Sequence, residues 1–175
     1  LLSSLTDEDL SNDAFPFLAS REISIGYAPV RVTRITYVGE LGWELYIPTE
    51  FTTHVYDAIV AEGGRFGLRH AGYNAMESLR TEKAYRGWGH ELTDLDTPLE
   101  AGLGFAVSFD KDFIGKEALS RQKETTLTKR LLVFTLDDAE PLLLGNEPIY
   151  RDGVYVGLTT SAAFGHTVGR SIAQG

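Results

Sequence analysis

Two stretches near the start of the chain, residues 21–27 and 29–38, are rich in β-branched side chains and constrain the fold most strongly. This composition is typical of β-strands. The turn sequence GELG follows at residues 39–42, and WELYIP at residues 43–48 predicts a returning strand. Strands joined by such short turns indicate an antiparallel sheet.

Segments with helical periodicity surround these strands. The predicted helices cover residues 5–13, 49–62, 75–85 and 113–122. Residues 103–109 predict a buried strand. An antiparallel sheet with packed helices places this part of the chain, residues 1–125, in the α+β class.

Beyond residue 130 the sequence predicts strands only. Residues 131–136 read as one strand, and Asp152 and Gly153 separate two alternating strands as a two-residue hairpin turn. The polar stretch at residues 123–129 is the predicted linker. We therefore expect a second, all-β unit over residues 126–175.

Composition excludes several classes of function. The 25 acidic and 16 basic residues give a net charge of −9, without the cationic cluster that nucleic acid requires. No apolar run approaches the roughly 20 residues of a membrane-spanning helix, so we expect no membrane partner.

The chain also lacks recognisable motifs of nucleophilic or metal chemistry. It contains no Cys, and His90-Glu91 is followed by Asp94 where a zinc protease motif needs His. We therefore predict no metal site. The one Met is Met76, and the final residues end within a predicted strand, so we expect the remainder of a longer chain as a partner.

The hairpin around residues 39–42 carries the main functional signal. If it closes a four-residue loop, Tyr37 lies opposite Glu44, and Tyr46 shares their face because side chains alternate along strands. Trp43 and Leu45 then face the core, together with Val38 and Ile47. One carboxylate between two phenols can bind the N–C–N edge of a pterin or purine. The same pattern also occurs on ordinary solvated sheet faces.

Long motifs resemble the folate-binding, aminomethyltransferase-like portion of sarcosine and dimethylglycine dehydrogenases. They are YVGELGWELYIP (37–48), ESLRTEKAYRGWG (77–89), TPLEAGLGF (97–105) and FIGKEAL (113–119). The opening LTDEDLSNDAFPF (5–17) is most similar to the sarcosine branch. The resemblance implies the later part of the folate-binding domain, followed at residues 126–175 by the truncated beginning of a C-terminal β-barrel.

The resemblance also implies an activity. A missing N-terminal domain would bind FAD and oxidise a small N-methyl amine, either sarcosine or dimethylglycine. The folate domain would capture the one-carbon unit as 5,10-methylenetetrahydrofolate. This oxidoreductase would work in a mitochondrial matrix or a bacterial cytoplasm, and this chain alone would be inactive.

Five positions match the folate contacts of the family. They are Tyr37, Glu44, Leu45, Tyr46 and Phe105. Phe105 replaces the usual Tyr, so stacking is kept and a phenol hydrogen bond is lost. An Arg that binds folate in the glycine-cleavage enzyme is Met76 here, and we expect Arg80 and Arg86 to pair with helix acids and the surface.

No catalytic residue is assigned within the chain, because the family's proton-accepting Asp would lie upstream of Leu1. Two alternatives stay open. One is a non-catalytic regulatory or scaffold protein of the same architecture. The other is a stand-alone folate-dependent aminomethyltransferase. Retention of Glu44 between two tyrosines favours the folate-binding enzyme over the scaffold.

Overall fold

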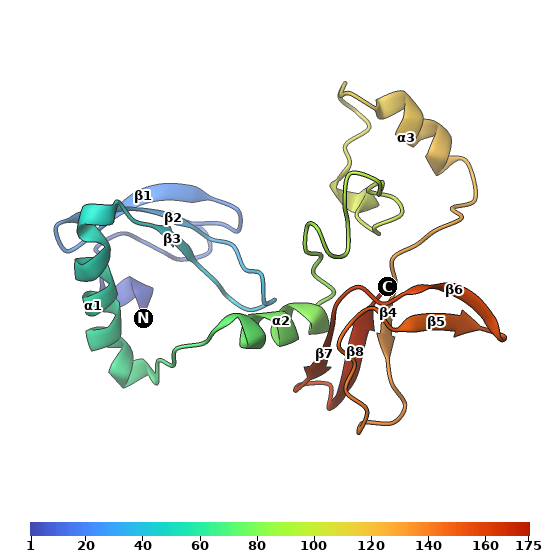
Figure 1. The fold of residues 1–175 in the computed structure, drawn as a ribbon. Helices are drawn as coiled ribbons and strands as arrows, with labels where there is room; N and C mark the ends of the chain where they lie inside the picture. Colours follow the sequence, from blue (N-terminus) through green and yellow to red (C-terminus); the bar gives the residue numbers. More distant parts are fainter. The chain divides into compact units, whose positions relative to one another are not determined.

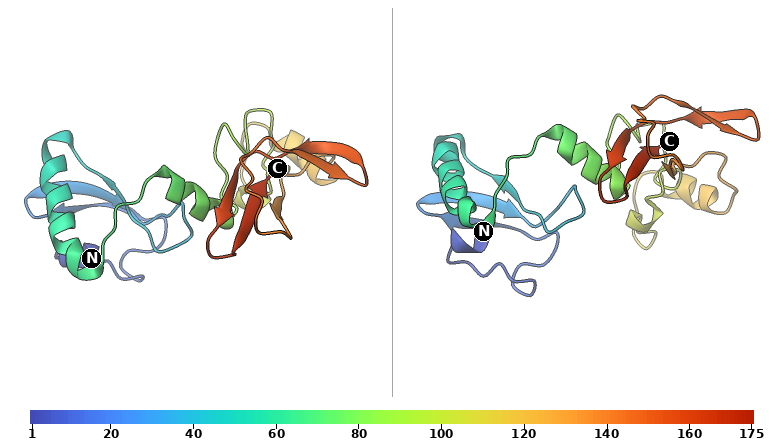
Figure 2. Two further views of the ribbon diagram at one scale, coloured as in Figure 1. Left: turned by 60° about the horizontal axis from the view of Figure 1, so that its bottom comes forward. Right: turned by 90° about the horizontal axis from the view of Figure 1, so that it is seen from below.

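The structure is a computed structural model that describes all residues, 1–175. The chain forms two compact units, Leu1–Met76 and Glu77–Gly175, and each is described by itself. Figures 1 and 2 show helices together with antiparallel sheets, which confirms the predicted α+β class. None of the helices combines the length and the apolar character that crossing a membrane would need.

The first unit is built on an antiparallel sheet with the strand order β1-β2-β3. Its strands are β1 (Ser20–Ile25), β2 (Ala28–Thr33) and β3 (Glu44–Tyr46). Residues Gly26 and Tyr27 connect β1 to β2, and Ile25 pairs with Ala28. Gly26 has a φ of +59°, and a Cβ atom there would lie 2.7 Å from His54 Nε2. The turn therefore requires glycine.

One face of this sheet and helix α1 (Thr52–Gly63) enclose the core of the first unit. Buried apolar residues alternate with exposed residues along β2 and at the end of β1. The buried cluster consists of Phe15, Ile23, Ile25, Ala28, Val30, Val32 and Val55. Trp43, Leu45 and Ile47 pack against it, which confirms the prediction that these three side chains face the core.

The connection between β2 and β3 shows that the predicted hairpin is wrong. Strand β2 ends at Thr33, and Glu44 pairs with Thr33 instead of Tyr37. Residues 34–43 contain no strand. Tyr37 therefore lies in a loop, outside the ladder that carries Glu44 and Tyr46.

Local contacts explain why the strands stop short. The hydroxyl of Thr36 accepts a hydrogen bond from the backbone N–H of Val38 at 3.2 Å, which gives the backbone a partner outside a sheet. Gly42 approaches Ile35 so closely that a Cβ atom would lie 2.6 Å from the Ile35 carbonyl oxygen. The segment thus folds back on itself as a compact loop.

The second unit contains two small antiparallel sheets, in the orders β4-β8-β7 and β5-β6. The strands are β4 (Val133–Thr135), β5 (Pro148–Arg151), β6 (Val154–Leu158), β7 (Ala162–Gly165) and β8 (Arg170–Gln174). Only strands follow residue 130, as predicted. Asp152 and Gly153 close the β5–β6 hairpin with φ values of +53° and +78°, which confirms the predicted turn.

The helices agree with the sequence at three of the four predicted places. Besides α1, they are α2 (Tyr73–Glu82), in which the division between the units falls, and α3 (Lys116–Lys123). Four 3-10 helices cover Leu2–Ser4, Thr49–Phe51, Gly64–Phe66 and Gly104–Ala106.

Two predicted elements are wrong. The helix expected at residues 5–13 does not form, because Asp9 accepts a hydrogen bond from the backbone N–H of Ser11 at 2.8 Å and favours a local turn. The strand expected at residues 103–109 is replaced by a 3-10 helix, and its neighbour Gly102 has a φ of +70°.

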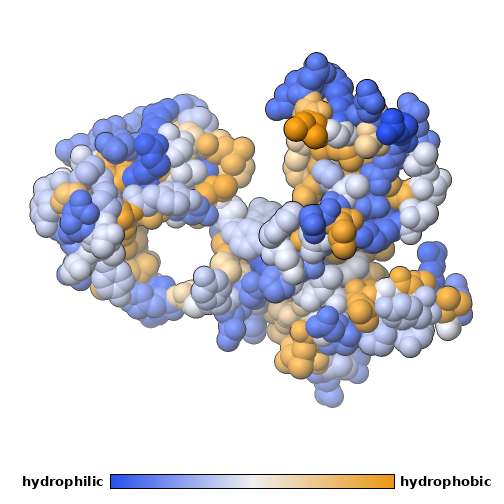
Figure 3. All heavy atoms as spheres, turned by 45° about the horizontal axis from the view of Figure 1, so that its top comes forward, coloured by the Kyte–Doolittle hydropathy of each residue, from blue (hydrophilic) through white to orange (hydrophobic).

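Large apolar side chains also reach the surface, as the orange patches in Figure 3 show. Leu41, in the loop before β3, is 73% exposed, whereas Ile25 at the end of β1 is 1% exposed. These two side chains therefore contribute very differently to the stability of the same unit.

We predict that Ile25→Ala lowers the free energy of unfolding of the first unit by about 2–5 kcal/mol, because it leaves a cavity in the core. Leu41→Ala is the matched control and should change that energy by less than about 0.5 kcal/mol. Urea unfolding followed by tryptophan fluorescence in a Trp88→Phe background measures both, since the remaining Trp43 packs edge-on against the buried Phe15 ring at 4.9 Å. Equal losses in the two variants would contradict the assigned core.

Candidate functional site

Strand β3 places two of the predicted site residues side by side on the open face of the first sheet. Leu45 between them packs against the core, so the flanking Glu44 and Tyr46 project from the other face. Both are exposed, and the Tyr46 hydroxyl donates a hydrogen bond of 2.7 Å to Glu44 Oε2. The structure thus brings Glu44 and Tyr46 together.

This contact favours the protonated form of the phenol. The hydrogen bond to Glu44, and then its negative charge, raise the pKa of the Tyr46 phenol above its ordinary value, because an ionised phenol would face a carboxylate. Tyr46 is therefore a neutral donor at physiological pH. Glu44 Oε1 makes no hydrogen bond within the chain, and a carboxylate offers about four lone-pair positions in all.

The other three predicted residues lie elsewhere. Tyr37 is half-buried in the loop between β2 and β3. Leu45 faces the core, so only its backbone is available to a ligand on the open face. Phe105 belongs to the second unit, where the 3-10 helix Gly104–Ala106 leaves its ring 87% exposed.

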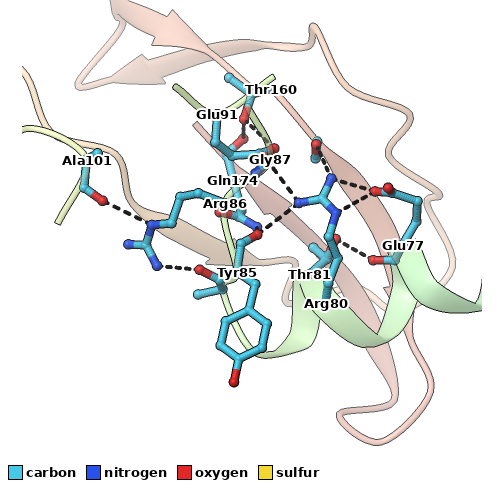
Figure 4. Close-up of polar contacts among 12 residues, drawn as sticks. Glu77, Arg80, Thr81, Tyr85, Arg86, Gly87, Glu91, Ala101, Thr160 and Gln174 are labelled. Atoms are coloured by element: carbon cyan, nitrogen blue, oxygen red, sulfur yellow. Dashed lines mark hydrogen bonds and ion pairs between the residues drawn. The ribbon is translucent and has the colours of Figure 1, made fainter. Parts of the chain in front are cut away.

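The second unit contains a buried polar cluster that the sequence analysis missed, shown in Figure 4. At its centre is Arg80 in α2, which is only 2% exposed. Its guanidinium group donates to Glu77 (2.7 Å), the Tyr85 carbonyl (2.9 Å), Glu91 (3.1 Å) and Ser161 (2.7 Å). The expectation that Arg80 pairs with a helix acid is confirmed at Glu77, but its surface location is wrong.

Glu91 is the buried partner of Arg80, with a side chain that is 0% exposed. It also accepts hydrogen bonds from the Gly87 N–H at 2.6 Å and the Thr160 hydroxyl at 3.2 Å. Burial raises the pKa of the Glu91 carboxyl, but hydrogen bonds from Ser161 and Gly87 and the charge of Arg80 outweigh burial. The pKa therefore lies below its ordinary value, and Glu91 is ionised at neutral pH.

These contacts attach the segment 77–91 to strands near the end of the chain. Gln174 in β8 donates through Nε2 to the Tyr85 carbonyl at 3.1 Å. The Ser78 hydroxyl donates to the Phe164 carbonyl of β7 at 2.6 Å. Most of these polar groups are buried and have hydrogen-bond partners within the cluster. The cluster therefore holds segment 77–91 in one position against β7 and β8 within the second unit.

A neighbour of this cluster, Arg86, also differs from the sequence-based expectation. Arg86 does not pair with a helix acid but donates to the backbone carbonyls of Ala84 and Ala101. Glu82 instead accepts from the backbone N–H groups of residues 167 and 168. Backbone partners of this kind depend on the tertiary fold and leave no mark in the local sequence.

The second unit also contains a cavity of about 900 Å³. Segment 127–132 and the β5–β6 hairpin form much of its wall, which includes Asp96, Lys129 and Tyr150. Asp96 and Lys129 form an ion pair of 2.5 Å. None of the five predicted site residues lines this cavity, so it provides no support for their role.

Comparison with known families assigns the chain. Residues 1–111 match the family described as "GCVT N-terminal domain", and residues 129–175 match the "Glycine cleavage T-protein C-terminal barrel domain". The chain belongs to the glycine cleavage T-protein family. The resemblance read from the motifs at residues 37–48 and 77–89 is thereby confirmed.

Relatives within this family include two dehydrogenases and a regulatory subunit. Over 99–100% of its length the chain is 44% identical to mouse mitochondrial sarcosine dehydrogenase and 45% identical to human mitochondrial dimethylglycine dehydrogenase. It is also 44% identical over its whole length to the mitochondrial pyruvate dehydrogenase phosphatase regulatory subunit of mouse. The chain spans 19–21% of the length of these relatives.

A solved structure supports the fold. The aminomethyltransferase T of the glycine cleavage system from Bartonella henselae superposes with a TM-score of 0.74 at 23% identity. The match covers 88% of this chain and 43% of that protein. The aminomethyltransferase-like architecture is therefore shared, as the sequence motifs predicted.

We predict that Glu91→Gln destabilises the second unit by about 3–5 kcal/mol at neutral pH, because it leaves the buried Arg80 charge with fewer partners. The pKa of Glu91 in the folded chain lies below the ordinary value of 4.5. Its ionised carboxylate therefore stabilises the fold above that pH, and the stabilisation is lost as the pH falls through the folded pKa.

Thermal unfolding at several pH values measures this effect. The melting temperatures of wild type and Glu91→Gln should converge as the pH falls below 4.5 and through the folded pKa of Glu91. Glu117→Gln, which alters a carboxylate that is 94% exposed, is the control and should follow wild type throughout. Parallel wild-type and Glu91→Gln curves would show that the Glu91 charge does not stabilise the fold.

Proposed function

We propose that this chain binds tetrahydrofolate on the open face of β3 and forms part of an FAD-dependent dehydrogenase of small N-methyl amines. The observation that carries the proposal is the Glu44–Tyr46 pair, a carboxylate oriented by a phenol on an exposed strand. The names of the two dehydrogenase relatives support the activity. Sarcosine and dimethylglycine are both candidate substrates.

The chemistry of the pair fits a pterin ring. A pterin presents two N–H groups on one N–C–N edge, and a carboxylate accepts two parallel hydrogen bonds from such an edge. The Tyr46 ring, 57% exposed beside the carboxylate, offers a surface for a planar heterocycle. Glu44 thus binds and orients the ring, and a single charged group accounts for recognition of its amino edge.

Tyr37, Leu45 and Phe105 stay proposed folate contacts on the strength of the motif resemblance alone. Leu45 would contribute through its backbone, since its side chain packs against the core. The Phe105 ring would stack without a phenol hydrogen bond. We also keep, as part of the proposal, the division into a folate-binding domain at residues 1–125 and the beginning of a barrel at residues 126–175.

Tetrahydrofolate, when bound, supplies the nitrogen that accepts the one-carbon unit as 5,10-methylenetetrahydrofolate. The residues of this chain position the ring, which lowers the entropic cost of the reaction. FAD and the amine would bind in other parts of the full-length protein. The mitochondrial relatives favour the mitochondrial matrix as the compartment, with a bacterial cytoplasm as the alternative.

A regulatory role is the second candidate function. It is favoured by the identity of 44% with the phosphatase regulatory subunit, which equals the identity with mouse sarcosine dehydrogenase. A third candidate, a stand-alone aminomethyltransferase, is favoured by the solved structure of such an enzyme with the same fold. Folate binding separates the regulatory candidate from the two enzymes, and a bound flavin separates the enzymes from each other.

We predict that Glu44→Gln weakens tetrahydrofolate binding by about 1.5–3 kcal/mol, or roughly 10- to 150-fold. Gln keeps the shape of Glu but loses the charge and one acceptor. Calorimetric titration of the full-length protein measures the dissociation constant. Glu40→Gln is the matched control, because Glu40 is an exposed carboxylate in the loop before β3 and should leave the affinity unchanged.

Two other titration results would contradict this prediction. A wild-type protein that does not bind tetrahydrofolate would overturn the proposed function in favour of the regulatory role. Equal binding by wild type and Glu44→Gln would show that folate binds elsewhere in the protein.

A further inference from the structure

The Tyr46 side chain has two parts that could contribute to ligand binding, the aromatic ring and the hydroxyl group. An aromatic residue next to a pterin site is usually expected to stack on the ring. The Tyr46 hydroxyl, however, is already committed to Glu44 Oε2 at 2.7 Å. The two residues are two positions apart on one strand, so they share a face without any help from the loop.

The neighbouring strand offers no other donor to the Glu44 carboxylate. Thr33 lies directly opposite Glu44, but its hydroxyl donates to Ser20 at 2.9 Å. Arg31 lies opposite Tyr46 and forms no ion pair with Glu44. Tyr46 is therefore the group within the first unit that holds this carboxylate in one orientation.

An exposed Glu side chain without such a contact would rotate freely, and ordering it on binding costs conformational entropy. The Tyr46 hydrogen bond removes part of that cost before the ligand arrives. Because Oε2 has a second lone pair and Oε1 is not engaged, two acceptors remain for a bidentate ligand edge.

We infer that Tyr46 is a positioning residue, which strengthens ligand binding through its hydroxyl by holding the Glu44 carboxylate ready for the N–C–N edge. This inference rests on the proposed function, and it assigns the hydroxyl a role separate from ring stacking. It follows that the effect of removing the hydroxyl depends on the presence of the Glu44 carboxylate.

A double-mutant cycle tests the inference. Full-length wild type, Tyr46→Phe, Glu44→Gln and the double variant are titrated with tetrahydrofolate in a calorimeter. Tyr46→Phe should weaken binding by about three- to tenfold, the effect of one lost hydrogen bond. In the Glu44→Gln background the same substitution should change the affinity by less than about twofold, because the charged partner is already gone.

Two further variants make the result specific. Tyr56→Phe removes a phenol hydroxyl from α1, where the ring is 53% exposed, and should bind like wild type. Tyr46→Leu removes the ring together with the hydroxyl, so any loss beyond that of Tyr46→Phe measures stacking. Because Tyr46 is 57% exposed, these changes leave the core of the first unit intact.

Two results would overturn the inference. The first is wild-type affinity in Tyr46→Phe. The second is the same loss in both backgrounds, which would mean that the hydroxyl acts on the ligand independently of Glu44. If Glu44→Gln alone binds like wild type, folate binds elsewhere and the proposed site on β3 fails together with the inference. If Glu44→Gln weakens binding but Tyr46→Phe does not, only the inference fails, so the two failures are distinguishable.

Discussion

The register of the first sheet is the constraint on which the candidate site depends. Val30 and Val32 on β2 are buried, which determines the face of the sheet that packs against the core. Because Leu45 on β3 pairs with Val32, the Leu45 side chain lies on the same face. A shift by one residue would place Glu44 in the core, where an unpaired carboxylate is costly. The apolar packing and the exposure of Glu44 and Tyr46 on the open face therefore both follow from one register.

A different interaction organises the second unit. Arg80 and Glu91 are both buried, and their charges are satisfied by each other and by hydrogen-bond partners from distant parts of the chain, including Thr160 and Ser161. Such a cluster contributes more to a unique arrangement than to net stability, since its desolvation cost is high. The cluster joins residues from the range 1–111 to residues from the range 129–175, the two ranges that match the two family descriptions.

The sequence predicted the parts of the structure that depend on local patterns. The Asp152-Gly153 turn, the three longer helices and the core-facing residues around Leu45 all follow from periodicity and turn chemistry. The pairing of Tyr37 with Glu44 failed because a hydroxyl at Thr36 and the close approach of Gly42 formed a loop. The Arg80 cluster could not be predicted, because its partners are up to 89 residues apart in the sequence.

The most direct test of the proposed folate site is a structure of the full-length protein with tetrahydrofolate bound. We predict that the amino edge of the pterin lies within hydrogen-bond distance of both Glu44 carboxylate oxygens, with the Tyr46 hydroxyl still donating to Oε2. A pterin bound elsewhere, with Glu44 and Tyr46 facing solvent, would contradict the proposed role of both residues.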